Sequence, residues 1–164
     1  ALHELRTQII SPMTDELKTD KEEDADELFQ QHIEAQCKRL RILGFTGTPI
    51  IRGNLNAMDK SLLPSLQTVC TEILNNIAKH GKPGAFAFIL SVGPDAVRIF
   101  ASNLYNAAIN SAPENHYGTA LIQDFAQQHN GTMTINSENE EWSLSLTIPL
   151  AHQVKLMFSP TEKL

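Results

Sequence analysis

The stretch from Thr71 to Gly81, "TEILNNIAKHG", carries two different sides of one predicted helix. Apolar residues recur at helical spacing and predict the best-defined helix of the chain between residues 61 and 80: Leu62, Leu66, Val69, Ile73 and Ile77. The breakers in "GKPG" end it. Beside the apolar stripe runs a polar one, which consists of Glu72, Asn76, Lys79 and His80.

The polar stripe has two interpretations. An amide oxygen such as that of Asn76 can bind Mg²⁺ together with phosphate oxygens and water, and Lys79 and His80 can complement phosphate charge. An ordinary solvated helix face would also be polar, and the spacing alone favours that simpler interpretation. The rest of the chain has to decide between a bound polyanion and an exposed surface.

Alternating residues on both sides of this helix predict a sheet. "AFAFILSV" and "AVRIFAS", separated by "GPD", predict a hairpin, and "PII" at residues 49–51 predicts a short edge strand. A second helix, "TALIQDFAQQHNG", precedes the strands "TMTINS" and "EWSLSLTIPL". In the last strand apolar and polar residues alternate, so one face is buried. The sequence therefore predicts an α+β fold, a two-layer sandwich with helices on one face of a mixed, mostly antiparallel sheet.

Length and composition limit the function. The 164 residues suit one domain with a short appendage, which we divide into a helical lead-in (1–44), a main domain (45–150) and a tail (151–164). A net charge of -6 argues against nucleic acid as a partner. Cys37 and Cys70 have neither metal-like nor redox-like spacing, which predicts a reduced, cytoplasmic setting and leaves a disulfide open. No apolar run of the roughly 20 residues needed to span a bilayer is present, so we expect no membrane contact by this segment, which could equally be the cytoplasmic part of a membrane-bound sensor.

The polar stripe resembles the Asn-containing box of the histidine-kinase and gyrase-type ATP-binding superfamily. That box reads Glu, three residues, Asn, two residues, a basic residue and His, and Glu72, Asn76, Lys79 and His80 match it position for position. The order of elements over residues 49–150 resembles the catalytic and ATP-binding domain of sensor histidine kinases. The resemblance implies the Bergerat-type ATP-binding fold with ATP and Mg²⁺ as cofactors, and it implies that Asn76 holds the metal, that Lys79 and His80 face the phosphates, and that Glu72 has a catalytic role.

Two further boxes of the family depart from its pattern. Asn103 stands where the family has an Asp that accepts a hydrogen bond from the adenine amino group. The amide oxygen can still accept, but without the carboxylate's charge the bond is weaker. The alternative is an Asn that starts a turn after a strand.

The second departure lies at the start of the second helix. "YGTALIQDF" keeps Gly118 and Leu121 of the family's Gly, any residue, Gly, Leu motif, whose backbone amides meet phosphates, and has Ala120 in place of the second Gly. The Thr119 hydroxyl either binds phosphate or caps the helix. Gly118, Thr119 and Leu121 are therefore candidate nucleotide contacts.

A candidate phosphoacceptor stands near the beginning of the chain. "LHELRT" resembles the phosphoacceptor box of sensor kinases, with His3 as the acceptor. Between such a His and the ATP domain the family has two long helices, for which too few residues are available here. We therefore expect the phosphoacceptor histidine to lie upstream of this segment or on another chain. The resemblance also implies a response regulator receiver domain as partner and a homodimer in the full-length protein.

Taken together, the residues and the resemblance predict the ATP-binding catalytic domain of a two-component sensor histidine kinase. It would transfer the γ-phosphoryl group of ATP to a histidine for relay to a response regulator. An anti-sigma-factor-type serine kinase is one alternative. A nucleotide-free interaction or dimerisation module on the same fold is the other, and Asn103 and Ala120 argue for it.

Overall fold

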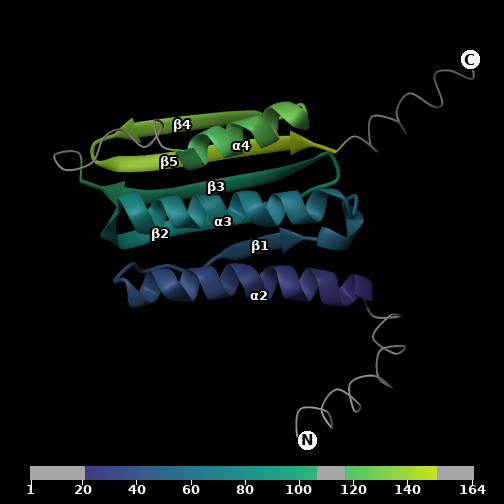
Figure 1. Ribbon diagram of the computed structural model, residues 1–164, viewed down its shortest axis with the longest axis horizontal. Helices are drawn as coiled ribbons and strands as arrows, with labels where there is room; N and C mark the ends of the chain where they lie inside the picture. Colours follow the sequence, from purple (N-terminus) through teal and green to yellow (C-terminus); the bar gives the residue numbers. More distant parts are fainter. Residues whose placement is uncertain (1–20, 107–116, 151–164) are drawn as a thin grey trace, which may run out of the picture.

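A computed structural model of the chain describes residues 21–106 and 117–150 (Figure 1). His3 and the predicted tail at 151–164 lie outside the described residues. The described elements are, in chain order, α2 (Lys21–Ile42), β1 (Ile50–Gly53), the short 3-10 helix η1 (Leu55–Ala57), α3 (Leu62–His80), β2 (Gly81–Val92), β3 (Ala96–Tyr105), α4 (Tyr117–Gln128), β4 (Thr132–Glu138) and β5 (Glu141–Pro149).

The five described strands form one mixed sheet. Their order is β1-β2-β3-β5-β4, and β1 pairs with β2 in parallel while the other three pairs are antiparallel. Helices α3 and α4 cover one face of the sheet and run along the strands, and α2 runs alongside α3 near β1 (Figure 1). The predicted fold class, the edge position of β1 and the β2–β3 hairpin are confirmed. The predicted alternation of β5 is also confirmed, because its apolar residues all face the core.

Helix α2 shares the core of the sheet and α3. Four of its residues on one side are at most 1% exposed and join the same apolar cluster as the strands: Phe29, Ile33, Cys37 and Leu40. The Nε2 atom of His32 also lies 2.8 Å from the hydroxyl oxygen of Thr71 on α3. The helix therefore packs as part of the folded unit, while the division of the chain at residue 44 stays a prediction.

The hairpin strands are longer than the sequence predicts. "GKPG" is no separate loop, because β2 begins at Gly81 immediately after α3 and absorbs a register shift before Phe86. Strand β3 runs on to Tyr105, since its ladder with β5 continues to the pair of Leu104 and Glu141. Asn103 thus lies inside a strand, and the alternative that it starts a turn after the strand is wrong.

Both cysteines are buried free thiols. Burial raises the pKa of the Cys37 thiol to about 11, with a smaller contribution from the nearby Glu34 carboxylate. Burial also raises the pKa of the Cys70 thiol. The disulfide that the sequence left open is absent from the described structure, and both side chains serve as core residues.

Candidate functional site

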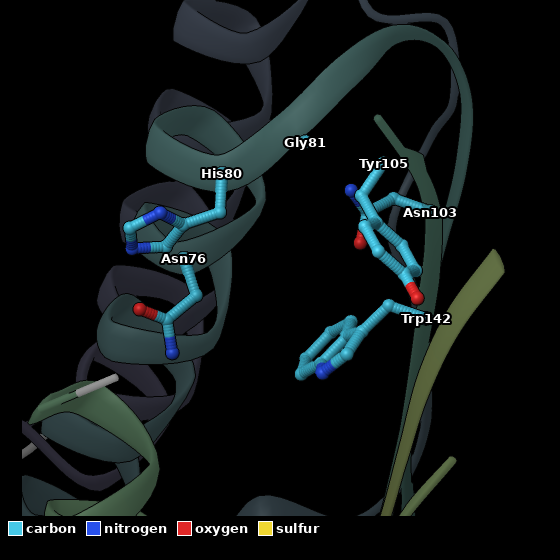
Figure 2. A pocket seen from close by; sticks show the side chains of 6 residues that line it. All are labelled: Asn76, His80, Gly81, Asn103, Tyr105 and Trp142. Atoms are coloured by element: carbon cyan, nitrogen blue, oxygen red, sulfur yellow. The ribbon is translucent and has the colours of Figure 1, made fainter. Parts of the chain in front are cut away.

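A small cavity lies where the last turns of α3 face β3 and β5 (Figure 2). Its space for a water-sized molecule is about 10 Å³, which is room for about one water. The lining residues are Asn76, His80, Gly81, Asn103, Tyr105 and Trp142. Three of them, Asn76, His80 and Asn103, are residues that the sequence predicted as nucleotide contacts, so the fold brings these together at one place.

Helix α3 positions Asn76 at the border of the core. Its neighbours Ile73 and Ile77 are fully buried against the sheet, and Asn76 itself lines the cavity. The Asn76 Nδ2 atom is buried and has no hydrogen-bond partner. Since an unpaired buried donor costs about 1–3 kcal/mol, this amide requires an acceptor from outside the described side chains, such as a water or a ligand atom.

Gly81 lets the end of α3 approach β3 closely. A Cβ atom at this residue would lie 2.3 Å from the Nδ2 atom of Asn103 and 2.4 Å from the carbonyl oxygen of Ile77. Both distances are shorter than any real contact of a Cβ atom. The glycine therefore does more than end the helix, because it makes room for the Asn103 side chain at the cavity wall.

Asn103 is a buried polar residue in the middle of the site. Its side chain is 5% exposed, and its Nδ2 atom donates a 2.8 Å hydrogen bond to the carbonyl oxygen of Leu104. Since the nitrogen is engaged in this way, the Oδ1 atom is the group suited to accept a hydrogen bond from a ligand amino group. This orientation agrees with the predicted contact to adenine, which stays a prediction.

Trp142 is the cavity residue that sequence reasoning missed most completely. It lies on β5 directly opposite Asn103 on β3, and its side chain is 2% exposed. Its Nε1 atom is buried without a hydrogen-bond partner, and among the described residues only the Asn76 Nδ2 atom shares that condition. Two donors without protein partners thus line one cavity, and a water or a ligand atom there can accept from them.

Gly81 and Tyr105 were missed as well. The sequence places Gly81 at a helix end and Tyr105 in a polar stretch, and neither pattern indicates a cavity. The signal that identifies both is the register of the β2–β3 hairpin, in which Gly81 and Tyr105 are direct partners. Strand register cannot be read from these residues alone.

The remaining predicted contacts lie outside the cavity lining. Glu72 is half-buried one turn before Asn76 on α3, and Lys79 is exposed near the helix end. In the first turn of α4, Gly118 is followed by Thr119, which is 4% exposed. The 39% exposed Leu121 lines a groove between α3 and α4 instead. Their predicted roles toward a nucleotide therefore stay predictions.

The side-chain oxygen atoms on α3 would fit a magnesium ion that takes only some of its ligands from the protein. No group of three or more His, Cys, Asp or Glu side chains gathers within residues 21–106 and 117–150, so these residues form no self-sufficient metal cage. Asn76 offers the oxygen of an amide group whose Nδ2 atom has no hydrogen-bond partner, and Glu72 offers a carboxylate one turn away. Such a sparse oxygen set suits Mg²⁺, which keeps several waters and takes further ligands from phosphate.

Comparison with known proteins supports the fold. No protein-family model and no curated protein matches the sequence. Among solved structures, the nucleotide-free catalytic domain of histidine kinase ThkA is similar with a TM-score of 0.57 and 11% identity, over 76% of this chain and 93% of that one. Histidine kinase AdeS from Acinetobacter baumannii is similar with a TM-score of 0.59 and 12% identity, over 88% of this chain and 80% of that one.

A third similar structure is the blue-light activated histidine kinase EL346 from Erythrobacter litoralis. Its TM-score is 0.56 at 13% identity, and the match covers 88% of this chain and 51% of that one. The chain thus has the fold of histidine kinase catalytic domains, as its sequence motifs predicted. At these identities the likeness establishes the fold, and the chemistry has to be argued from the site.

Proposed function

We propose that this chain is the nucleotide-binding domain of a histidine kinase and that it holds Mg-ATP between α3 and the cavity end of β3 and β5. The γ-phosphoryl group would pass to a histidine and from there to the receiver domain of a response regulator. In the transfer, a ring nitrogen of the acceptor histidine attacks the γ-phosphorus. The bond from that phosphorus to the ADP oxygen breaks, and ADP leaves with the electron pair.

The convergence of the polar groups carries this proposal. Asn76 and His80 from α3 and Asn103 from β3 meet at one cavity although they are distant in sequence, and the cavity presents two buried donors without partners. A purine offers ring nitrogens and an amino group, and the attached phosphates offer charged oxygens. A nucleotide can therefore satisfy the Asn76 donor, which the folded chain leaves unpaired.

The residues around the cavity would divide the work of binding. The Asn103 oxygen would accept from the adenine amino group, His80 and the exposed Lys79 would face the phosphates, and Asn76 would hold the metal. When bound, Mg²⁺ neutralises charge on the phosphates. Glu72 would orient water in the outer shell of the ion, while Thr119 and the first turn of α4 would donate to phosphate oxygens.

The setting of this activity follows from the same proposal. Within the described ranges, no helix is long and apolar enough to cross a membrane. We place the domain in the cytoplasm, where ATP and response regulators are found, and in a full-length protein that dimerises. The acceptor histidine would lie on the partner subunit or upstream of this segment.

A calorimetric titration with Mg-ATP tests the proposal. The wild-type chain should bind, and Asn76→Asp should bind more weakly while it remains folded, because an added negative charge at the amide position repels phosphate. Leu28→Ala is a matched control, since Leu28 is 62% exposed on α2 and its loss should leave binding unchanged. Labelled phosphate transferred to the chain or to an added acceptor should be acid-labile, whereas an acid-stable product would indicate a serine kinase.

A nucleotide-free interaction module is the second candidate function. The size of the cavity favours it, because about 10 Å³ holds no purine as the side chains now stand. The uncharged Asn103 favours it too, since the amide binds an amino group more weakly than a carboxylate does. If neither the wild type nor any of its folded variants binds nucleotide at millimolar concentration, this second function replaces the first.

A further inference from the structure

The indole of Trp142 fills the space in which a base facing Asn103 would lie. The two residues are register partners on neighbouring antiparallel strands and point to the same side of the sheet, where side chains of such a pair are close neighbours. Figure 2 shows the indole extending from β5 toward α3. A base in contact with the Asn103 oxygen and with phosphates near α3 would cross this same space.

The free volume rules out both occupants together. What remains beside the indole accommodates about one water molecule, and a purine is several times larger. Tyr105, at 8% exposed, also lines the cavity, but Trp142 is the largest of the six side chains and the most deeply buried of the aromatic ones. Displacement of the indole would free the largest space that any one of these side chains can free.

The packed position of the indole is not a fully satisfied one. Its Nε1 atom has no acceptor there, and the Asn76 Nδ2 atom on the opposite wall has none either. The unsatisfied side-chain group is specific to the cavity end of β5. The other buried residues on the same face of this strand have no polar side-chain atom: Leu144, Leu146 and Ile148.

We propose that Trp142 is the gate and the affinity-determining residue of the base subsite: a purine enters only when the indole swings out of the cavity. This inference rests on the proposed nucleotide-binding function and adds to it the reason for weak binding. The unpaired Nε1–H lowers the cost of leaving the cavity. The gate acts on the base and not on the phosphates, because the indole lies against Asn103 and not at the start of α4.

Titrations of Trp142→Ala with three ligands test the gate. We expect affinity for Mg-ATP to rise about tenfold or more over the wild type, affinity for adenosine to rise by a similar factor, and affinity for inorganic triphosphate to stay unchanged. Leu146→Ala is the matched control, because it also removes a buried side chain from the inner face of β5 and should raise no affinity. Circular dichroism verifies that each variant is folded, and Trp142→Val replaces the alanine variant if that one unfolds.

The outcomes separate the gate from the function on which it rests. If the wild type binds Mg-ATP, loses it in Asn76→Asp and gains nothing from Trp142→Ala, the nucleotide site stands and the gate is overturned. An equal gain for triphosphate would overturn the gate as well, since the effect would then not lie at the base. If no folded variant binds any of the ligands at millimolar concentration, the gate and the proposed function both fall.

A measurement on the wild-type chain gives an independent test. Trp142 is the only tryptophan, so intrinsic fluorescence reports on this one side chain. Saturating Mg-ATP should make the indole more accessible to a neutral quencher such as acrylamide, because the side chain leaves a position in which it is 2% exposed. Unchanged or reduced quenching in the saturated protein would overturn the gate.

Discussion

The two sides of helix α3 are built differently. On the side toward α2, the Thr71 hydroxyl group donates to the Gln67 carbonyl oxygen at 2.9 Å and is hydrogen-bonded to the Nε2 atom of His32 at 2.8 Å. On the side toward β3 and β5, the Asn76 Nδ2 atom and the Trp142 Nε1 atom have no partners and share a cavity. One side of the helix completes these polar contacts within the chain, and the other carries two donors without protein partners. This contrast supports the proposal that a nucleotide binds on the side toward β3 and β5.

The largest expected effect is a loss of stability on the side of α3 that packs against α2. Ile33→Ala should lower the free energy of unfolding by about 2–5 kcal/mol, because Ile33 is fully buried between α2 and the core. The urea-induced unfolding transition measures it. Leu28→Ala on the same helix, 62% exposed, is the control and should cost less than about 0.5 kcal/mol. Equal small losses in both would mean that α2 is a detachable lead-in.

A second prediction concerns the close approach at the cavity. Gly81→Ala should destabilise by about 1–3 kcal/mol, since the new methyl group would collide with the Ile77 carbonyl oxygen and the Asn103 side chain. Gly93→Ala is the control, because its nearest neighbouring atom would lie 3.5 Å away, an ordinary contact distance. Thermal unfolding compares the two. A Gly81→Ala protein as stable as the Gly93→Ala protein would show that the wall of the cavity is looser than described.

The third prediction is a pair of substitutions of opposite sign on the two sides of α3. Asn76→Ala should raise the free energy of unfolding by about 1 kcal/mol, because it removes an unpaired buried donor and introduces the best helix former. Thr71→Val should lower it by about 1 kcal/mol, since His32 loses its hydrogen-bond partner. Chemical denaturation of both variants without nucleotide gives the two values. If both substitutions changed the free energy of unfolding in the same direction, the proposed difference between the two sides of α3 would be wrong.

The fourth prediction concerns the pH dependence of stability from Cys37, which lies on α2 and faces the core. In the folded chain the pKa of Cys37 is raised from 9.0 to about 11, so between these values the unfolded thiol loses its proton while the folded one keeps it. The unfolded state then binds fewer protons, and stability falls as the pH rises through this range. In Cys37→Ala the fall should be shallower, as measured by urea unfolding at a series of pH values under reducing conditions. Identical slopes would mean that the thiol ionises freely in the folded chain.

Much of the fold could be predicted from periodicity. The alternation in β5, the helical spacing in α3 and the "GPD" turn each encode a local element, and helices with one apolar face on such strands leave few architectures. The ends of β2 and β3 could not be predicted, because Gly81, Pro83 and Gly84 read as breakers until a neighbouring strand pairs with them. Strand pairing depends on the whole sheet and overrides local preference.

The candidate site could be predicted only where a motif covered it. Asn76, His80 and Asn103 were found from the resemblance to a family box, and the fold places all three on one cavity. Trp142 was read simply as an inward-facing residue of an alternating strand. Its position opposite Asn103 follows from the pairing of β3 with β5, across an interval that contains α4 and β4. Such a long-range register has no local signature in the sequence.

The central claim is that the cavity side of α3 receives a nucleotide, and the indole N–H of Trp142 tests it most directly. As the only tryptophan, it gives a single indole signal in a nitrogen–proton correlation spectrum. Titration with Mg-ATP should move this signal to a saturating limit in the wild type and leave it in place in Asn76→Asp at the same concentrations. A signal that stays still in the folded wild type up to millimolar Mg-ATP would contradict the account.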